Sequence, residues 1–205
     1  MKSSCRSRGD EAQTEKIGGS SRRLLQIYGM NVAISNRQRT RKINLRLLKR
    51  IADALLAELK IEKAELGVHL AAAPEMTRLN EKFLQRAGST DVITFNYTDN
   101  GRAGRLQPAA KPGAMGTSCP ALHGEIFICV DEAVWQAHPF RTNWQSEIVR
   151  YLVHGVLHLL GHDDSRPGDR RKMKREESRR LRELSRRFSL AQLARPAKLP
   201  ACKKR

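Results

Sequence analysis

The feature that most constrains the fold of this chain is an apolar segment, residues 143–160, that contains two histidines. Its apolar residues recur with helical periodicity and cover most of the helix surface, so we predict a buried helix with Thr142 as its N-cap. His154 and His158 are four residues apart and therefore lie on the same face, about one turn from each other. This spacing allows two imidazoles to bind one cation.

The residues that follow supply a third ligand. Gly161 can adopt the left-handed conformation that ends a helix, and the chain then turns so that a later residue can return to the two histidines. Asp164 is the predicted ligand, and His162 is the alternative. A single buried histidine is commonly a core residue with a polar partner, but two histidines followed by a glycine and a carboxylate favour a metal site. We therefore predict that His154, His158 and Asp164 bind a metal ion.

The ligand spacing is that of the metzincin zinc proteases, with two departures. Their general-base glutamate follows the first histidine, where this chain has Gly155, and their third ligand is a histidine, where this chain has Asp164. The missing glutamate argues against a peptidase, because that residue activates the water molecule in those enzymes. A glycine inside a helix costs about 1 kcal/mol relative to alanine, so we expect that a substrate or a neighbouring strand approaches closely at Gly155.

Length and composition fit one folded domain with tails. The 205 residues include 40% hydrophobic residues, enough for a core, and the formal net charge of +18 favours a polyanionic partner such as RNA or DNA. The sequence shows no apolar run of transmembrane length and no secretory signal, and its four cysteines form no C-x-x-C pair. We therefore expect a cytoplasmic protein without membrane association.

The chain divides into a domain and flanking segments. We expect a disordered N-terminal extension (1–29), one folded domain (30–188) with a mobile loop (98–122), and a loose basic tail (189–205). Within the domain, the residue patterns predict strands at 31–35, 65–72, 91–97 and 124–130 and helices at 44–60, 74–84, 143–160 and 170–187, with a short helix capped by Asp131. The helix at 170–187 is strongly basic, and its charge run is either a solvated face or a surface that contacts phosphates.

The segment from His154 to Asp164 resembles the motif H-G-x-L-H-L-x-G-Y-D-H of the YbeY endoribonucleases, which act in bacterial ribosomal RNA maturation. Seven of the nine specified positions match. Further blocks lie upstream in the order of the family: Asn80 with Phe83 resembles its N-x-x-Y segment, Ser89–Phe95 its P-T-D-V-L-S-F segment, and Gly124–Ile126 its G-D-I strand. The resemblance spans 32–187, which is nearly all of the chain except its two tails and the central loop.

The resemblance implies a fold, a cofactor and an activity. The fold is α+β, a small mixed sheet packed by helices, with the metal-binding helix buried in its centre. One Zn²⁺ bound by His154, His158 and Asp164 retains an open coordination position, as catalytic zinc sites do. The implied protein is a zinc-dependent endoribonuclease that cleaves single-stranded RNA in 16S rRNA 3′-end maturation and ribosome biogenesis. Its partners would be rRNA, the small ribosomal subunit and associated proteins.

The chain departs from the family motif at functional positions. The family's third histidine falls on Asp164 and its tyrosine on His162, which keeps His162 as the alternative ligand. Many members carry an arginine directly after the N-x-x-Y segment, where this chain has Leu84, so Arg86 is the predicted replacement as a substrate contact. These departures keep a second function open, a ribosome-associated RNA-binding factor with a structural metal and little catalysis.

No motif assigns a general base. Asp91, Glu125 and Asp163 are candidates by residue type, and orienting a ligating histidine is an equally good role for each. We predict Arg86, Asp91 and Glu125 as catalytic residues. The cleavage position and the oligomeric state stay open.

Overall fold

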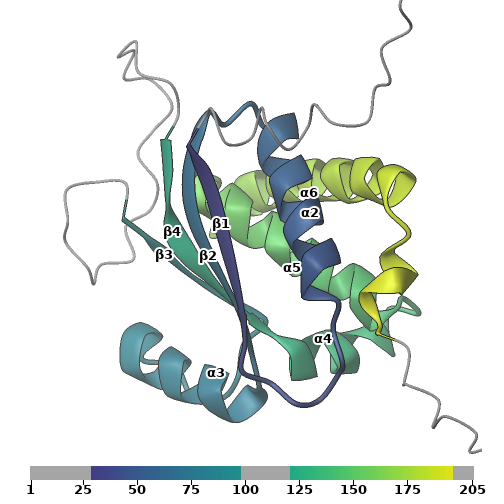
Figure 1. Ribbon diagram of the computed structural model, residues 1–205. Coiled ribbons are helices and arrows are strands. Elements are labelled where there is room, and N and C mark those ends of the chain that lie inside the picture. The colour runs from purple at the N-terminus through teal and green to yellow at the C-terminus, as the bar shows by residue number, and fades with distance from the viewer. Residues whose placement is uncertain (1–28, 98–120, 196–205) are drawn as a thin grey trace, which may run out of the picture.

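A four-stranded mixed sheet forms the centre of the structure, a computed structural model that describes residues 29–97 and 121–195 (Figure 1). The strand order is β1-β2-β4-β3, in which β1, β2 and β4 are parallel and the edge strand β3 is antiparallel to β4. The expectations for 1–28, 98–120 and 196–205 lie outside the described residues. The strand bounds are Met30–Asn36 (β1), Lys63–Ala71 (β2), Val92–Asn96 (β3) and Ala121–Cys129 (β4).

Helices cover the two faces of this sheet unequally. In Figure 1, α2, α5 and α6 lie on one side of the sheet, and α3 lies near one end. This arrangement confirms the predicted α+β fold with a small mixed sheet packed by helices. Within the described residues, no helix is long and apolar enough to cross a membrane. The bounds are Leu45–Glu58 (α2), Ala73–Leu79 (α3), Asn80–Leu84 (η1, a π-helix), Val130–Ala137 (α4), Trp144–Leu159 (α5), Pro167–Arg187 (α6) and Leu190–Leu193 (η2, a 3₁₀ helix).

The main core lies between the sheet and the helices α2, α5 and α6. Successive side chains of a strand point to opposite faces. In β4, Ile126 and Ile128 therefore belong to the main core, whereas Phe127 and Cys129 belong to a smaller cluster that includes residues of α3. Most apolar side chains of α5 are fully buried, which confirms the prediction that the helix with the two histidines is a core helix.

Two predicted helix caps are wrong. α5 is capped by Asn143, whose side chain accepts a hydrogen bond from a backbone N–H of the first turn (2.8 Å), whereas Thr142 donates its hydroxyl proton to the buried Glu147 (2.6 Å). Asp131 lies inside α4 and accepts a hydrogen bond from the N–H of Ala73 at the start of α3 (2.6 Å). Asp131 satisfies a group that tertiary packing brings close, which the local sequence does not record. Thr142 instead bonds a side chain five residues later, at the start of the same helix.

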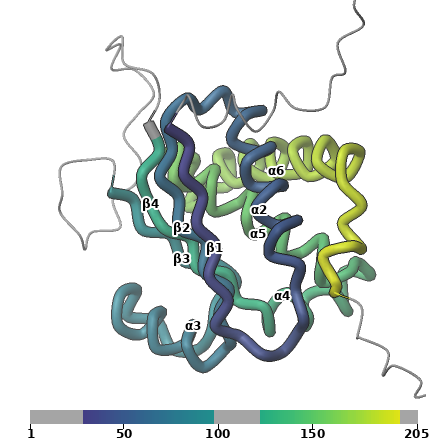
Figure 2. Tube along the Cα trace, in the orientation of Figure 1, coloured from purple at the N-terminus to yellow at the C-terminus, as the bar shows by residue number. Residues whose placement is uncertain are grey.

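The chain beyond α6 packs against the core as far as residue 195. Leu190 and Leu193 are buried, and the Asn44 N–H at the start of α2 donates a hydrogen bond to the Leu193 carbonyl (2.8 Å). Figure 2 shows this segment turning back from the end of α6. The prediction of a loose tail from residue 189 is therefore wrong for these residues, because two leucines fill the edge of the core. Leu122 is also buried, in β4, so the predicted mobile loop does not extend to it.

Gly155 lies where α5 meets the sheet. A Cβ atom there would be 2.7 Å from Cγ2 of Ile126 in β4, which is too close for van der Waals contact. At the end of the helix, Leu159 packs over Gly124, whose own Cβ would be 2.9 Å from Cδ2 of the leucine. The neighbouring strand therefore explains the glycine in the helix, and two missing side chains set the distance between α5 and β4.

We expect the substitution Gly155→Ala to lower the free energy of unfolding. Alanine gains about 1 kcal/mol of helix propensity, but its methyl group forces Ile126 or the helix to move, which costs about 1–3 kcal/mol. The expected net loss is about 1 kcal/mol, measured by urea-induced unfolding followed by circular dichroism.

Gly168 in the first turn of α6 provides a matched control. A Cβ atom there would meet nothing within 4 Å. Gly168→Ala should therefore leave the free energy of unfolding unchanged or raise it by up to about 1 kcal/mol. Equal stabilities of the two variants would contradict the close packing of α5 on β4.

Candidate metal centre

α5 carries His154 and His158 one turn apart on the same face. Their Nε2 atoms are 3.1 Å apart, and their rings are nearly perpendicular with centroids separated by 4.6 Å. The buried apolar side chains of α5 hold the helix on the sheet. The two rings therefore meet because of their spacing on a fixed helix, and no loop has to order for them to approach.

α5 ends in a Schellman turn, as Gly161 predicts. The glycine has a φ of 101°, its N–H donates to the His158 carbonyl (3.0 Å), and the His162 N–H donates to the Leu157 carbonyl (3.0 Å). The same reversal places the His162 carbonyl 3.0 Å from Nδ1 of His158. The turn that ends the helix therefore also orients one of the two rings.

Asp164 returns to the histidines after this turn. One ligand atom from each of His154, His158 and Asp164 lies within 4.8 Å of the other two. Arg170 donates from Nε to the Asp164 carbonyl (3.0 Å), which fixes the backbone of the ligand turn. The structure thus brings together the three residues predicted as ligands. His162, the alternative, is exposed and contributes its backbone carbonyl.

A second carboxylate, from α6, orients the other ring. Glu177 accepts a hydrogen bond from Nδ1 of His154 (3.1 Å) and another from Arg150 (2.9 Å). Arg150 also pairs with Glu147 (3.2 Å), so a chain of charged side chains joins α5 to α6. Glu177 is only 7% exposed. Burial would raise its pKa, but the hydrogen bonds from His154 and Arg150 hold the pKa below its ordinary value.

These partners fix the tautomers of both rings. An ionised carboxylate and a carbonyl oxygen can only accept hydrogen bonds, so Nδ1 of His154 and Nδ1 of His158 both carry protons. In the neutral imidazoles, the two Nε2 lone pairs then face each other across 3.1 Å. Facing lone pairs repel, and a cation between them removes the repulsion. The residues therefore fit a metal ion held by two imidazoles and the carboxylate of Asp164, a ligand set that zinc accepts.

A proton competes with a metal ion for this position. Burial disfavours the charged form of His154, but the hydrogen bond and charge of Glu177, together with Asp91 and Asp164, raise the pKa of His154 above its ordinary value. Burial and the positive charge of His154 lower the pKa of His158. Because only the deprotonated ligand binds metal, metal affinity should fall as the pH drops through the raised pKa of His154.

Glu125, one of the predicted catalytic residues, does not lie at this cluster. It is placed on β4 between Gly124 and Ile126, which face α5, so its side chain points to the opposite face of the sheet. There it accepts a hydrogen bond from Tyr97 (3.1 Å) and lies 3.6 Å from His69. The structure therefore does not bring Glu125 to the cluster, because the alternation along the strand directs its carboxylate to the opposite face.

The remaining candidates differ in their surroundings. Asp91, directly before β3, acts through its negative charge on His154. Asp163 accepts hydrogen bonds from the side chain and backbone of Ser165, which lower the pKa of Asp163. Arg86 is exposed in the segment between η1 and β3. Asp91 accepts hydrogen bonds from the Thr90 hydroxyl and the Val92 N–H through Oδ1 alone (both 3.0 Å), whereas Ser165 engages both carboxylate oxygens of Asp163.

The sequence analysis missed Glu177 and the carbonyl of His162. Glu177 is hidden in the charge run of α6, where acids are expected to pair with neighbouring arginines. It nevertheless falls on the apolar side of that helix, four residues after Met173 and seven before Leu184, and all three are buried. A carboxylate on the apolar face of a helix, such as Glu177, indicates a buried polar contact and could have been found in the sequence. The contact made by the backbone carbonyl of His162 could not, because every residue has such a carbonyl.

A comparison with known protein families connects this geometry to a group of enzymes. The family model described as Endoribonuclease YbeY matches residues 33–185, well over half of the chain. The chain belongs to the YbeY family. The predicted family and the predicted enzyme class, an endoribonuclease, are therefore confirmed.

Individual YbeY relatives support this assignment. The protein named Endoribonuclease YbeY in Geobacter metallireducens is 31% identical over 68% of this chain and 85% of its own length. The protein of the same name in Chlorobium luteolum is 30% identical over 77% of this chain and 100% of its own length. The Myxococcus xanthus relative is 37% identical over 67% of this chain, which spans only 42% of that protein's length. A solution structure from Thermotoga maritima, 20% identical, shares the fold with a TM-score of 0.52 over 85% of this chain and 100% of its own.

We expect Glu177→Gln to weaken metal binding. Glutamine keeps the shape of the side chain but loses the charge that holds the Nδ1 proton of His154, and it leaves Arg150 without its partner on α6. Loss of such a contact typically costs about 10–100-fold in metal affinity. Competition for Zn²⁺ with a chromophoric chelator measures the change.

Glu176→Gln is the control on the same helix. Glu176 pairs with Arg179 and Arg180 of α6. Its replacement removes the same charge one residue away and should leave the Zn²⁺ affinity unchanged. Equal affinities of the two variants would show that Glu177 does not position His154.

Proposed function

We propose that the protein is a zinc-dependent endoribonuclease that cleaves single-stranded RNA in the maturation of the 16S rRNA 3′ end. It would act in the cytoplasm, in contact with the small ribosomal subunit. The observation that supports this most is the pair of facing Nε2 atoms with Asp164 beside them, in a member of the YbeY family. The net charge of +18 supports a polyanionic substrate. The choice of zinc, 16S rRNA and the ribosome follows from the family resemblance.

The ligands would be held ready before the substrate arrives. Glu177 fixes the ring of His154, the carbonyl of His162 fixes the ring of His158, and α5 fixes both rings on the sheet. Two neutral imidazoles and one carboxylate would leave positive charge on a dication. Bound zinc would supply a Lewis acid for a phosphoryl oxygen of the RNA.

Cations beside the cluster would bind the RNA backbone. Arg170 contacts the carbonyl of Asp164, so it lies next to the ligand turn, and exposed basic residues follow it on the first half of α6. In the second half, Arg179 and Arg180 form ion pairs with Glu176 and Glu183. In the first half, Lys172 pairs with Asp169, but Arg171, Lys174 and Arg175 form no ion pair with any of the described residues. We therefore assign phosphate contact to the first half of α6. Arg86, exposed before β3, is proposed as a further phosphate contact.

Asp91 is the proposed proton acceptor or orienting group. Its charge acts on His154, and its neighbours Thr90 and Val92 donate hydrogen bonds to Oδ1 alone. Glu125 lies on the other face of the sheet, and Ser165 engages both carboxylate oxygens of Asp163. In a cleavage reaction, the Asp91 carboxylate would accept the proton of the attacking hydroxyl or water. If it only orients a ligand, its removal would lower metal affinity together with the cleavage rate.

An RNA-binding factor with a structural metal is the second candidate function. It is favoured by the position of Glu125, which leaves the cluster with fewer carboxylates for proton transfer than the sequence suggested. Such a factor would bind RNA and metal but would cleave RNA slowly or not at all. Measurement of cleavage and binding on the same protein separates the two functions.

The central test of this proposal is His158→Ala. The variant removes one ligand from a half-buried position, so the fold should persist. Loss of a metal that supplies several kcal/mol of transition-state stabilisation should lower RNA cleavage by about 100-fold or more. The measurements are bound metal in the purified protein and the rate of cleavage of a labelled single-stranded RNA.

His138→Ala serves as the control, because His138 is exposed at the end of α4. It should retain metal and full activity. Equal cleavage by wild type and His158→Ala would exclude the metal centre as the catalytic site. RNA binding without cleavage by metal-loaded wild type would establish the binding factor instead.

A further inference from the structure

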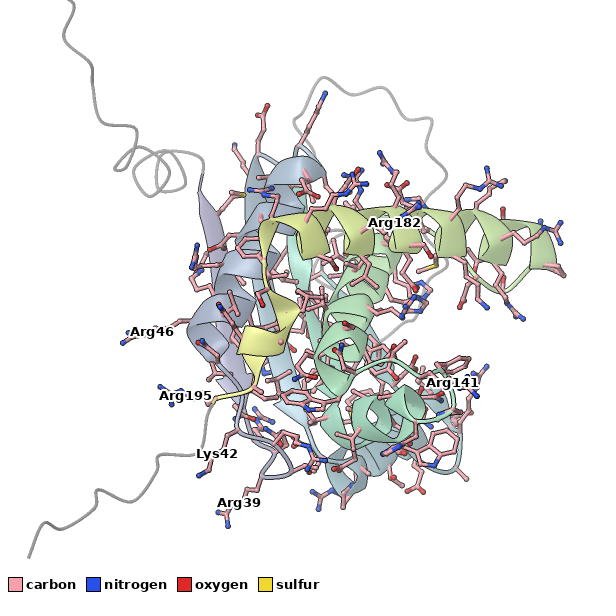
Figure 3. The ribbon with its side chains drawn as sticks, turned by 90° about the vertical axis from the view of Figure 1, so that its right-hand side faces the viewer. Arg39, Lys42, Arg46, Arg141, Arg182 and Arg195 are labelled. Carbon is pink, nitrogen blue, oxygen red and sulfur yellow. The ribbon has the colours of Figure 1, made fainter. Side chains whose placement is uncertain are left out.

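A group of cations lies away from the metal centre, around the loop that joins β1 to α2. We name Arg39, Lys42, Arg46 and Arg195 the basic corner. All four residues are exposed, and Figure 3 shows them pointing outward from one corner of the molecule. They come from the loop, the first turn of α2 and the residues after η2. Segments that are distant in sequence therefore contribute to one positively charged surface.

The loop of the basic corner is fixed by a buried glutamine. Gln38 is 5% exposed, donates from Nε2 to Oδ1 of Asn36 (2.9 Å) and to the Arg41 carbonyl (2.8 Å), and accepts from the Arg41 N–H (2.9 Å). Thr40 donates its hydroxyl proton to Asp131 of α4 (2.5 Å). These contacts hold the backbone in one conformation, so the cations of the loop project from a rigid base.

The segment after η2 is joined to this loop through the backbone. The Arg195 N–H donates to the Lys42 carbonyl (3.0 Å), and Ile43 and Ala194 form an isolated antiparallel bridge. Buried Leu193 secures the segment on the core. Arg195 is therefore held next to Lys42 by the fold.

The charges of the basic corner are not neutralised by carboxylates of the described residues. Neighbouring cations do have such partners: Arg37 pairs with Glu75 (2.9 Å) and Lys49 with Asp53 (3.3 Å). No ion pair within 29–97 and 121–195 involves a side chain of the basic corner. Like charges held close together repel, and a bound polyanion removes that repulsion.

The basic corner and the metal centre lie at different strands of the sheet. The loop follows the last residue of β1, and its Arg37 N–H donates to the Leu70 carbonyl near the end of β2 (2.9 Å). α5 packs on β4 beyond β2, where Gly155, between the two histidines, meets Ile126 in the middle of the strand. One phosphate group cannot contact both places, whereas an RNA of many nucleotides can reach from one to the other.

We propose that the basic corner is a second RNA-binding surface, which binds the phosphate backbone of the substrate outside the cleaved segment. The proposal rests on the proposed endoribonuclease function, because it assigns the same substrate to a surface remote from the metal centre. Arginine presents a fork of donors that matches phosphate oxygens, and each bound phosphate releases counterions. The buried Gln38 reduces the ordering cost of binding, because the loop is already folded.

The two surfaces have different kinetic effects. A long RNA can contact the basic corner and the metal centre together, and the corner then raises its local concentration at the cluster. A short RNA that fills only the metal centre gains nothing from the corner. The corner should therefore lower KM for long RNA and leave kcat unchanged.

The test is the triple variant Arg39→Ala, Lys42→Ala, Arg46→Ala in the full-length protein. Fluorescence anisotropy with a long single-stranded RNA gives Kd at several salt concentrations. We expect Kd to rise by about tenfold or more at low salt, and the slope of log Kd against log salt concentration to fall by about 2–3. KM for cleavage of the long RNA should rise in parallel, with kcat and cleavage of a short RNA unchanged.

A second triple variant, Lys63→Ala, Arg78→Ala, Arg141→Ala, removes the same charge from exposed positions elsewhere. It should change Kd and the salt slope much less. The charge-keeping variant Arg39→Lys, Arg46→Lys should bind nearly as the wild type does, which excludes misfolding as the cause of the loss. Equal Kd values and slopes for the two triple variants would overturn the proposal.

The binding measurement does not depend on cleavage, so the two proposals fail separately. A protein that binds RNA through the corner but does not cleave it would refute the endoribonuclease function and keep the corner. If the protein cleaves RNA but the two triple variants have equal Kd values and salt slopes, the endoribonuclease function stands and the basic corner is refuted. The protein could also bind polyglutamate more tightly than RNA and lose this binding in the triple variant of the basic corner. That result would assign the surface to an acidic protein and overturn the proposal.

Discussion

Two imidazole nitrogens that face each other at 3.1 Å are the constraint on which the structure around α5 depends. The Nδ1 atoms of His154 and His158 are committed as donors to Glu177 and to the His162 carbonyl, so the Nε2 lone pairs have no other role than to bind a cation or a proton. Two facing Nε2 lone pairs repel each other, so the arrangement is stable only when a cation or a proton lies between them. Asp164 places a negative charge there as well and favours a dication over a proton.

Several parts of the fold serve this arrangement. The contact of Gly155 with Ile126 brings α5 close to the sheet, and the Schellman turn at Gly161 both ends the helix and supplies the carbonyl that orients His158. α6 contributes Glu177 from a separate segment of the chain. The positively charged surfaces are then divided between the first half of α6, near the cluster, and the basic corner beside the end of β1.

What the sequence could predict is what local geometry determines. A four-residue spacing, a glycine and a nearby carboxylate place His154, His158 and Asp164 together through one helix and one turn, and the structure brings them together. Glu125 and Glu177 could not be placed in this way, because the face of a strand and the packing of two helices decide what each carboxylate meets. The role of Asp131 and the buried leucines after α6 were missed because their partners are distant in sequence. The cap of α5 was misplaced by one residue, because Thr142 and Asn143 are both residue types that cap helices.

X-ray absorption spectroscopy at the zinc edge of the purified, zinc-loaded protein tests the central claim most directly, because it reports the number and kind of ligands without relying on activity. The account predicts two imidazole nitrogens and one carboxylate oxygen at about 2.0–2.2 Å, with water or buffer in the remaining position. A third imidazole, which would come from a histidine such as His162, or a protein that takes up no zinc at the cluster, would contradict it.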